Sequence, residues 1–384
     1  MFSFFRSKSS ICLGTAFFLM GFLFGNWATL IPFIKQSYSL DDGVLGLILL
    51  CLPLGAMTFN PVAAKLISKY GHQKVTAFGM VFISITYLLP FSINTFALLP
   101  LALMIVGFSM TILNISANIS ATNLELHENV SIMATCHGMF SIGLMSGSLM
   151  RSLTLLVNIN EVIHMLVICG ISLILTAITR KTILCMPDQK RTESKIAKKS
   201  AFALPKGDLL IIIIISVCIN MTEGSMTDWA SVYMKEIVIT NPYFVGWGLF
   251  GYSFFMAIGR LFGDGIIPVY GRNNILIYGS ILAFIGLSIV IFLPFTFSSI
   301  IGFGFIGLGV SCGSPILYAS ASRYPDIPDG GGLALMNSFA MGGFLLGPVV
   351  IGFISNATSL QVAFGFVALI SLIWMTLSKR VSLY

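Results

Sequence analysis

Apolar stretches about 20 residues long follow one another along the whole chain, and they limit the fold more than any other feature. A helix of about 20 apolar residues crosses the hydrocarbon core of a bilayer. Only 9% of the 384 residues are charged, against roughly a quarter in soluble domains. The sequence therefore predicts an all-α polytopic membrane protein with twelve transmembrane helices. Their expected positions are 10–34, 43–66, 74–94, 97–124, 130–155, 159–180, 208–235, 242–266, 273–295, 297–321, 330–355 and 359–378.

Lys and Arg residues concentrate in alternate connections between these stretches. Short cytoplasmic loops are enriched in basic residues. One set of connections carries most of them, including the run from Arg180 to Lys206, whereas the other set carries only Lys35, Arg151 and Lys235. We therefore expect a multi-pass protein of the bacterial inner (plasma) membrane with both termini in the cytoplasm. The net charge of +7 then reflects topology and not nucleic-acid binding.

A polar and basic segment with two prolines interrupts the apolar stretches near the middle of the chain. We expect it to be a cytoplasmic linker, residues 181–206, between an N-terminal six-helix bundle (1–180) and a C-terminal six-helix bundle (207–384). This division gives each bundle the same number of predicted spans.

The two halves of the chain are related in sequence. Gly71 matches Gly271, and His137 matches Asn337, each at an offset of 200 residues. Parallel repeats of this kind are typical of major facilitator-type transporters, whose halves rock about a site near the bilayer midplane. Further matches at the same offset are Gly107 with Gly307, Gly143 with Gly343 and Gly147 with Gly347, whose small side chains favour close helix packing.

The loop from Ala64 to Lys74 resembles the G-x-x-x-D-R-x-G-R-R signature of the major facilitator superfamily, with Ser68, Lys69 and Gly71 at the Asp, Arg and second Gly positions. This resemblance implies two six-helix bundles and a transport role. Longer segments resemble one branch, the YbjJ-like proteins related to fucose permeases. Relatives in this branch carry an acidic residue in helix four, where this chain has Asn114. The segments are Gly25 to Ala28, Ser39 to Gly46, Cys136 to Gly147, Thr222 to Ser225, Asp228-Trp229, Gly259 to Asp264 and Gly342 to Pro348.

Glu223 lies near the middle of the predicted helix 208–235. An ionisable group at that depth is costly and usually faces a cavity or a partner. Asn220, Glu223 and Thr227 are spaced so that they share one helix face. We expect this face to line a central cavity, where Glu223 carries a proton or binds solute. The alternative is a protonated carboxyl group bonded to a neighbouring helix.

Asp228 lies on the same predicted helix, about 140° around its axis from Glu223. It either bonds within the bundle or caps the outer gate, and Asn26 matches it in the first half of the chain. Trp27 and Trp229 follow these two residues. The two indole rings are either platforms for a sugar-like ring in the central site or anchors at the membrane interface.

The predicted helix 97–124 is unusually polar. Asn114 and Asn118 belong to one stripe at helical spacing, and a second stripe runs beside it. We expect one stripe to face the cavity and the other to bond to a neighbouring helix. His137 in the next helix either titrates with the cavity or is a hydrogen-bonded structural residue, as its repeat partner Asn337 suggests. The stripes are Thr111, Asn114, Asn118, Thr122 and Glu125, and Ser116, Ser120 and Asn123.

Charged residues near the inner helix ends predict a cytoplasmic gate. Glu125 resembles the family's inner-loop carboxylate and is expected to pair with Lys69. Arg260 and Asp264 are four residues apart on one helix, so a local ion pair is expected. The predicted gate comprises Lys69, Gly71, Glu125, Arg260, Asp264, Gly271 and Arg272.

Nothing in the sequence predicts an enzyme, a cofactor or a metal site. The seven cysteines and four histidines lack ligand-type spacing. The expected partners are a small polar organic solute, protons as coupling ion and the lipid bilayer, with the protein acting as a monomer. Three hypotheses follow: a proton-coupled importer, an exporter of metabolites or drugs, and a membrane sensor or scaffold that does not transport.

Overall fold

The computed structural model describes residues 4–5, 7–128, 132–187, 206–324 and 331–383. Regular structure in these residues is helical, and no strand occurs among them. Eleven helical stretches within them are long and apolar enough to cross a membrane, and a further helix, α8 (Met133–Leu155), has 23 residues. The predicted all-α polytopic fold is confirmed.

The first group of helices runs from α2 to α9 and includes two short turns of helix. Most of its helices pack on one another. The elements are α2 (Lys8–Ser37), α3 (Asp42–Thr58), α4 (Asn60–Tyr70), α5 (His72–Thr86), α6 (Leu89–Ser92), η1 (Phe96–Leu98), α7 (Leu99–Glu128), α8 (Met133–Leu155) and α9 (Glu161–Leu184).

The second group runs from α10 to α16. The predicted linker between the groups lies mostly outside the described residues, so the division into two domains stays a prediction. The elements are α10 (Gly207–Glu236), η2 (Pro242–Phe244), α11 (Trp247–Tyr270), α12 (Arg272–Phe292), α13 (Thr296–Val310), α14 (Gly313–Ser322), α15 (Gly331–Ala357) and α16 (Leu360–Ser378).

The predicted stretch 74–94 is divided into α5 and the short α6, and two further predicted helices are each divided into two helices of ten residues or more. The stretch 43–66 becomes α3 and α4, which meet at Phe59, and Pro61 lies in the first turn of α4. The stretch 297–321 becomes α13 and α14, and Pro315 lies in the first turn of α14. Proline lacks an N–H donor and its ring clashes with the preceding turn. A break followed by the start of a new helix is therefore more favourable at these positions than a continuous helix.

Glycines bring α2 and α8 into backbone contact. A methyl group on Gly21 would meet the carbonyl of Phe140 in α8, and one on Gly143 would meet the carbonyl of Phe18 in α2. Small residues let transmembrane helices approach this closely. The same arrangement recurs in the second group, where a methyl group on Gly343 of α15 would meet the carbonyl of Val217 in α10.

Gly71 and Gly271 end α4 and α11 with nearly the same backbone geometry. Their φ angles are 84° and 80°, and their ψ angles are 152° and 151°. Positive φ is accessible to glycine without a steric penalty. In each case the next helix begins at the following residue. Two residues 200 positions apart thus make the same sharp turn, in agreement with the repeat expected from the sequence.

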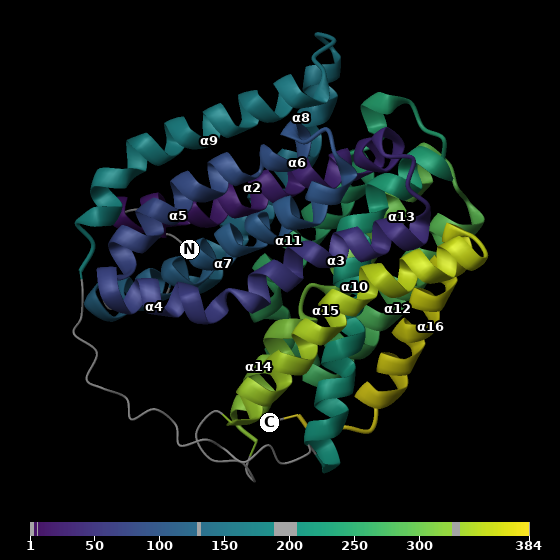
Figure 1. Cartoon of the computed structure of the whole chain (residues 1–384). Coiled ribbons are helices and arrows are strands. Elements are labelled where there is room, and N and C mark those ends of the chain that lie inside the picture. Colours follow the sequence, from purple (N-terminus) through teal and green to yellow (C-terminus); the bar gives the residue numbers. More distant parts are fainter. Residues whose placement is uncertain (1–3, 6, 129–131, 188–205, 325–330, 384) are drawn as a thin grey trace.

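Figure 1 shows that the two helix groups converge on one side and diverge toward α4 and α14. The groups touch where α3 packs on α15, α8 on α11 and α2 on α10. We call the side where α2 and α10 end the Lys35 end, and the side where α4 and α11 end the Gly71 end. Both marked chain termini lie toward the diverging side (Figure 1).

Candidate functional site

A charged pair joins α10 and α11 where the two helix groups meet. Nη2 of Arg260 lies 3.3 Å from Oε1 of Glu223, and the two side chains are 25% and 20% exposed. Nη1 of the same guanidinium donates to Oγ of Ser141 in α8, at 3.3 Å. Arg260 therefore links the acid of the second group to a helix of the first group.

The sequence predicted a partner for Arg260 four residues away, Asp264, whose side chain lies outside the described residues, so that pair stays a prediction. Among the described residues, the guanidinium contacts Glu223 and Ser141. Glu223 is 37 positions from Arg260 in the chain, so helix spacing alone gave no sign of the contact. Arg260 thus contacts the acid of α10, and its predicted part in a cytoplasmic gate stays a prediction.

Two tyrosines and a histidine surround the pair. Tyr252 is fully buried and lies within electrostatic range of both Glu223 and Arg260. Its hydroxyl is one of the buried polar atoms of the described residues that have no hydrogen-bond partner. Tyr318 lies within electrostatic range of Glu223 and donates to Oδ1 of Asn337, at 2.8 Å. We call Glu223, Arg260, Tyr252, Tyr318, Asn337, Ser141 and His137 the central polar cluster.

His137 is exposed and lies within electrostatic range of Arg260. Its ring packs edge-on against Phe17, with 5.3 Å between ring centroids. Asn337, its repeat partner, is also exposed, on α15. The structure therefore places both members of this repeated pair at the central polar cluster, from opposite helix groups.

The other polar residues of α10 bond mainly within that helix. Asn220 is half-buried and donates to the carbonyl of Ser216, at 2.8 Å. Thr227 is buried, and its hydroxyl donates to the carbonyls of Glu223 and Gly224, both at 3.0 Å. Of these two, Asn220 has the accessible side chain that contact with a solute requires.

The two polar stripes of α7 have different surroundings. Asn114 is exposed and Asn118 half-buried, and Asn118 donates to the carbonyl of Asn114 at 2.8 Å. Ser120 and Asn123 of the second stripe contact the two ring nitrogens of His72, at 2.9 Å and 2.8 Å. His72 begins α5, so the second stripe bonds to a neighbouring helix. The first stripe does so too, because Thr111 donates to the carbonyl of Ala56 in α3 at 3.0 Å. The expected division of roles between the stripes stays a prediction.

Asn26, Trp27, Asp228 and Trp229 are all buried. Burial corrects the expectation for the two indole rings, whereas for Asp228 it fits the alternative of a place within the bundle. Trp27 packs edge-on against Phe91, and the indole N–H of Trp229 donates to the carbonyl of Pro348 at 3.1 Å. These indoles are therefore neither platforms in an open site nor interfacial anchors. The reason is that α2 and α10 lie among several helices, which leaves little of their surface open.

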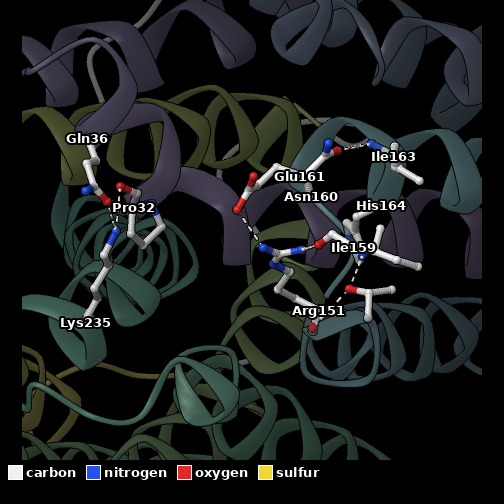
Figure 2. Close-up of polar contacts among 10 residues, drawn as sticks. Pro32, Gln36, Arg151, Ile159, Asn160, Glu161, Ile163, His164 and Lys235 are labelled. Atoms are coloured by element: carbon white, nitrogen blue, oxygen red, sulfur yellow. Dashed lines mark hydrogen bonds and ion pairs between the residues drawn. The ribbon is translucent and has the colours of Figure 1, made fainter. Parts of the chain in front are cut away.

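Asn26 belongs to a buried network that the sequence did not indicate. Its Oδ1 lies 2.9 Å from Nε2 of His164, whose Nδ1 lies 2.9 Å from Oγ1 of Thr154. Arg151 nearby contacts Glu161 at 2.6 Å and donates to the carbonyl of Ile159 at 2.7 Å (Figure 2). The one available signal was His164 alone in an apolar helix. This network joins α2, α8 and α9 near the Lys35 end.

A second set of ionic contacts closes the Lys35 end between the two helix groups. Nζ of Lys35 lies 2.5 Å from Oδ1 of Asp42 and 2.5 Å from Oε2 of Glu236. Asp42 also accepts a hydrogen bond from Ser355 of α15. Lys235 contacts Oε1 of Gln36 at 2.7 Å (Figure 2). We call Lys35, Asp42, Glu236, Ser355, Lys235 and Gln36 the Lys35 clasp.

The residues of the predicted cytoplasmic gate are dispersed at the Gly71 end. Lys69 is exposed and lies over the ring of Tyr70, 5.1 Å from its centroid. Glu125 accepts hydrogen bonds from the N–H groups of Ile132 and Met133, at 2.6 Å and 2.8 Å. The expected contact of Glu125 with Lys69 is thus replaced by capping of α8. Arg272 is half-buried at the start of α12, after Gly271.

Comparison with known sequences identifies the family. A model of the Major Facilitator Superfamily matches residues 13–328 and 213–381, and the chain belongs to this superfamily. An uncharacterised MFS-type transporter of Yersinia pestis is 32% identical over 357 residues, which cover 93% of this chain and 91% of the relative. The membrane protein MosC of Rhizobium meliloti is 25% identical over 368 residues, covering 93% and 86%.

Solved structures show the same fold. The nucleoside transporter NupG superposes with a TM-score of 0.75 at 16% identity, covering 97% of this chain and 99% of NupG. The fucose:proton symporter FucP of E. coli superposes with a TM-score of 0.62 at 16% identity, covering 97% and 98%. The resemblance to fucose permease-like members of the superfamily is confirmed, and the protein is a multi-pass MFS transporter.

Proposed function

We propose that this chain is a secondary active transporter that moves a small polar organic solute across the bacterial inner membrane, coupled to protons. The observation that carries the proposal is the Glu223–Arg260 pair, which Ser141 connects to the opposite helix group. An ionisable group held between the two halves can respond to their movement. Alternating access about a site between the halves is the mechanism expected for this architecture.

The conformation supports a site that opens toward the Gly71 end. The Lys35 clasp holds the two helix groups together at one side, and the groups diverge at the other (Figure 1). The excess of basic residues near the Gly71 end supports a cytoplasmic location for that end. We therefore interpret the structure as the inward-facing state of a monomer with both termini in the cytoplasm.

Within this scheme, Glu223 carries the coupling proton, and the accessible amide, phenol and imidazole groups bind the solute. Asn114, Asn118, Asn220, Asn337 and His137 are the side chains with the exposure that this role requires. Amide and phenol groups offer both hydrogen-bond donors and acceptors. Such a lining suits a hydroxylated, sugar-like molecule. The fucose:proton symporter with the same fold favours this reading.

Transport by purified protein in liposomes tests the coupling. A thermal-shift screen of a metabolite library first finds the solute, because a bound solute stabilises the folded protein. An imposed pH gradient should then drive uptake by the wild type. Glu223→Gln should abolish gradient-driven uptake and keep exchange of preloaded solute, whereas Asp208→Asn, near the start of the same helix, should behave as wild type.

The outcomes separate the proposal from its alternatives. Gradient-driven uptake that persists in Glu223→Gln would remove Glu223 from the coupling step. If an inward proton gradient drives the solute outward, in the direction opposite to the protons, the protein is an exporter. If no solute of the library is bound or moved, the protein is a sensor or scaffold.

A further inference from the structure

Glu223 and Arg260 carry opposite charges in the central polar cluster and are each other's partner. Glu223 contacts Arg260 of α11, and Tyr252 of α11 and Tyr318 of α14 lie within electrostatic range of it. From α8, Ser141 and His137 lie near Arg260. Asp228, further along α10, lies instead within electrostatic range of Tyr87 in the first helix group. Among the side chains that the structure describes, the charges of Glu223 and Arg260 cancel while Glu223 is ionised.

The ion pair is loosely held. A single contact of 3.3 Å joins Nη2 of Arg260 to Oε1 of Glu223, whereas a strong charge-assisted contact measures roughly 2.7–2.9 Å. A guanidinium has five N–H donors in a planar fork that fits a carboxylate with two parallel bonds. Glu223 accepts one hydrogen bond from the guanidinium, through Oε1, and does not form the two parallel bonds. Arg260 can therefore hold another carboxylate more tightly than it holds Glu223.

Protonation of Glu223 changes the charge of the cluster from zero to plus one. Leaving one member of a partly buried ion pair without its partner is strongly unfavourable. An entering anion of one charge would restore neutrality, whereas a neutral sugar would leave Arg260 uncompensated. One guanidinium also suits a single negative charge better than the two charges of a phosphate ester.

We propose that the solute bears one carboxylate group, which replaces Glu223 on Arg260 when Glu223 takes up the coupling proton. This inference rests on the proposed function and names the chemical class of its substrate. The remaining part of the solute is a polar, hydroxylated body that the nearby amide and phenol groups can bind. One proton and one monocarboxylate then move together, so each transport cycle carries no net charge.

Binding measurements test the substrate class without relying on transport. Thermal shifts of the purified full chain are recorded with matched sets of solutes that share a polar body, such as D-gluconate, D-glucose and D-glucosamine, together with further monocarboxylates and their neutral analogues. Members with a carboxylate should stabilise the protein at pH 5.5, and their neutral and amine analogues should not. Because one proton is linked to binding, the carboxylates should bind more tightly at pH 5.5 than at pH 8.

Two variants make the test specific for the pair. Arg260→Gln should lose the response to carboxylates, with Asp208→Asn as the matched control that keeps it. Glu223→Gln imitates the protonated acid, so it should bind carboxylates at pH 8 as tightly as at pH 5.5. This second variant keeps the test decisive even if Arg260→Gln does not fold. The proposal would be overturned if only the neutral analogues stabilise the protein, or if none of the carboxylates does. It would also be overturned if carboxylates stabilise Arg260→Gln as much as they stabilise the wild type.

Transport under a membrane potential separates this inference from the proposed function. Uptake of the carboxylate should follow the pH gradient and should not change when a potassium diffusion potential of either sign is imposed. A proton symporter of neutral solutes would respond to both, and that result would overturn the carboxylate inference while leaving proton coupling intact. If carboxylates bind in a way that depends on Arg260 but no uptake is driven by the pH gradient, the proposed proton coupling would be overturned and the carboxylate inference would stand.

Discussion

Lys35 at the end of α2 and Glu236 at the end of α10 form an ion pair of 2.5 Å, although 201 positions separate them in the chain. The same ammonium group contacts Asp42 at 2.5 Å. Three helices from two groups therefore meet at one cation that is only 14% exposed. Opening of the Lys35 end requires that this cation exchange its protein partners for water.

We predict that Lys35→Met shifts the protein toward a state that is open at the Lys35 end. Methionine keeps the apolar stem of the side chain and removes the charge, so that the conformation closed at the Lys35 end loses about 1–3 kcal/mol of hydrogen bonding to charged groups. Spin labels at Val157 and Ile239, which are 66% and 79% exposed, report the separation of the two groups at this end. Their distance distribution should broaden toward longer values.

Lys379→Gln provides the control for this experiment, because Lys379 is exposed near the end of α16, away from the clasp. It should leave the distances unchanged. If Lys35→Met also leaves them unchanged, the clasp does not determine which state is populated.

The orientation of the chain gives a second prediction. In a variant without the seven native cysteines, a cysteine at Ile239 should react in intact cells with a maleimide that does not cross membranes. A cysteine at Lys379 should react only after the cells are opened. Both positions are exposed, so a difference in labelling reports the side of the membrane. The opposite pattern would place the termini outside.

Close packing of α2 and α8 predicts unequal effects of two glycine substitutions. Gly143→Ala should lower stability by about 1–3 kcal/mol, because the added methyl group overlaps the backbone carbonyl of Phe18 and forces the helices apart. Gly170→Ala in α9 has open space around the new methyl group and should be neutral or slightly stabilising. Thermal unfolding in detergent measures both. Equal losses would show that helix separation does not account for the effect.

The helices could be predicted from sequence because each depends on a local property, a length of apolar chain. Their ends follow equally local signals, such as Asp41, whose side chain accepts from the N–H of Val44 at 2.7 Å and begins α3. The repeat also indicated the sharp turns at Gly71 and Gly271, because backbone geometry of that kind is encoded in a few residues.

The site could be predicted only in part, because its contacts join distant segments. Glu223 was found from its depth in one helix, but its partner Arg260 comes from another. Trp27 and Trp229 were misplaced because a helix face is open or buried according to how many neighbouring helices surround it, and the sequence of one helix does not contain that information. His164 was missed for the same reason, since its partner Asn26 is 138 positions away.

Tyr252 gives a prediction that distinguishes a structural hydroxyl from a functional one. Its phenol oxygen is buried within electrostatic range of the Glu223–Arg260 pair and has no hydrogen-bond partner among the described residues. Buried polar groups of proteins are nearly always hydrogen-bonded, to protein, water or ligand. Tyr252→Phe should therefore leave thermal stability unchanged, while affinity for the solute found in the library screen falls by about five- to tenfold, the value of one hydrogen bond. Tyr318→Phe is the matched comparison: it removes the donor to Asn337 and should lower stability by about 0.5–1.5 kcal/mol. If Tyr252→Phe is destabilised as much as Tyr318→Phe and binds solute normally, the hydroxyl of Tyr252 supports the fold and takes no part in binding.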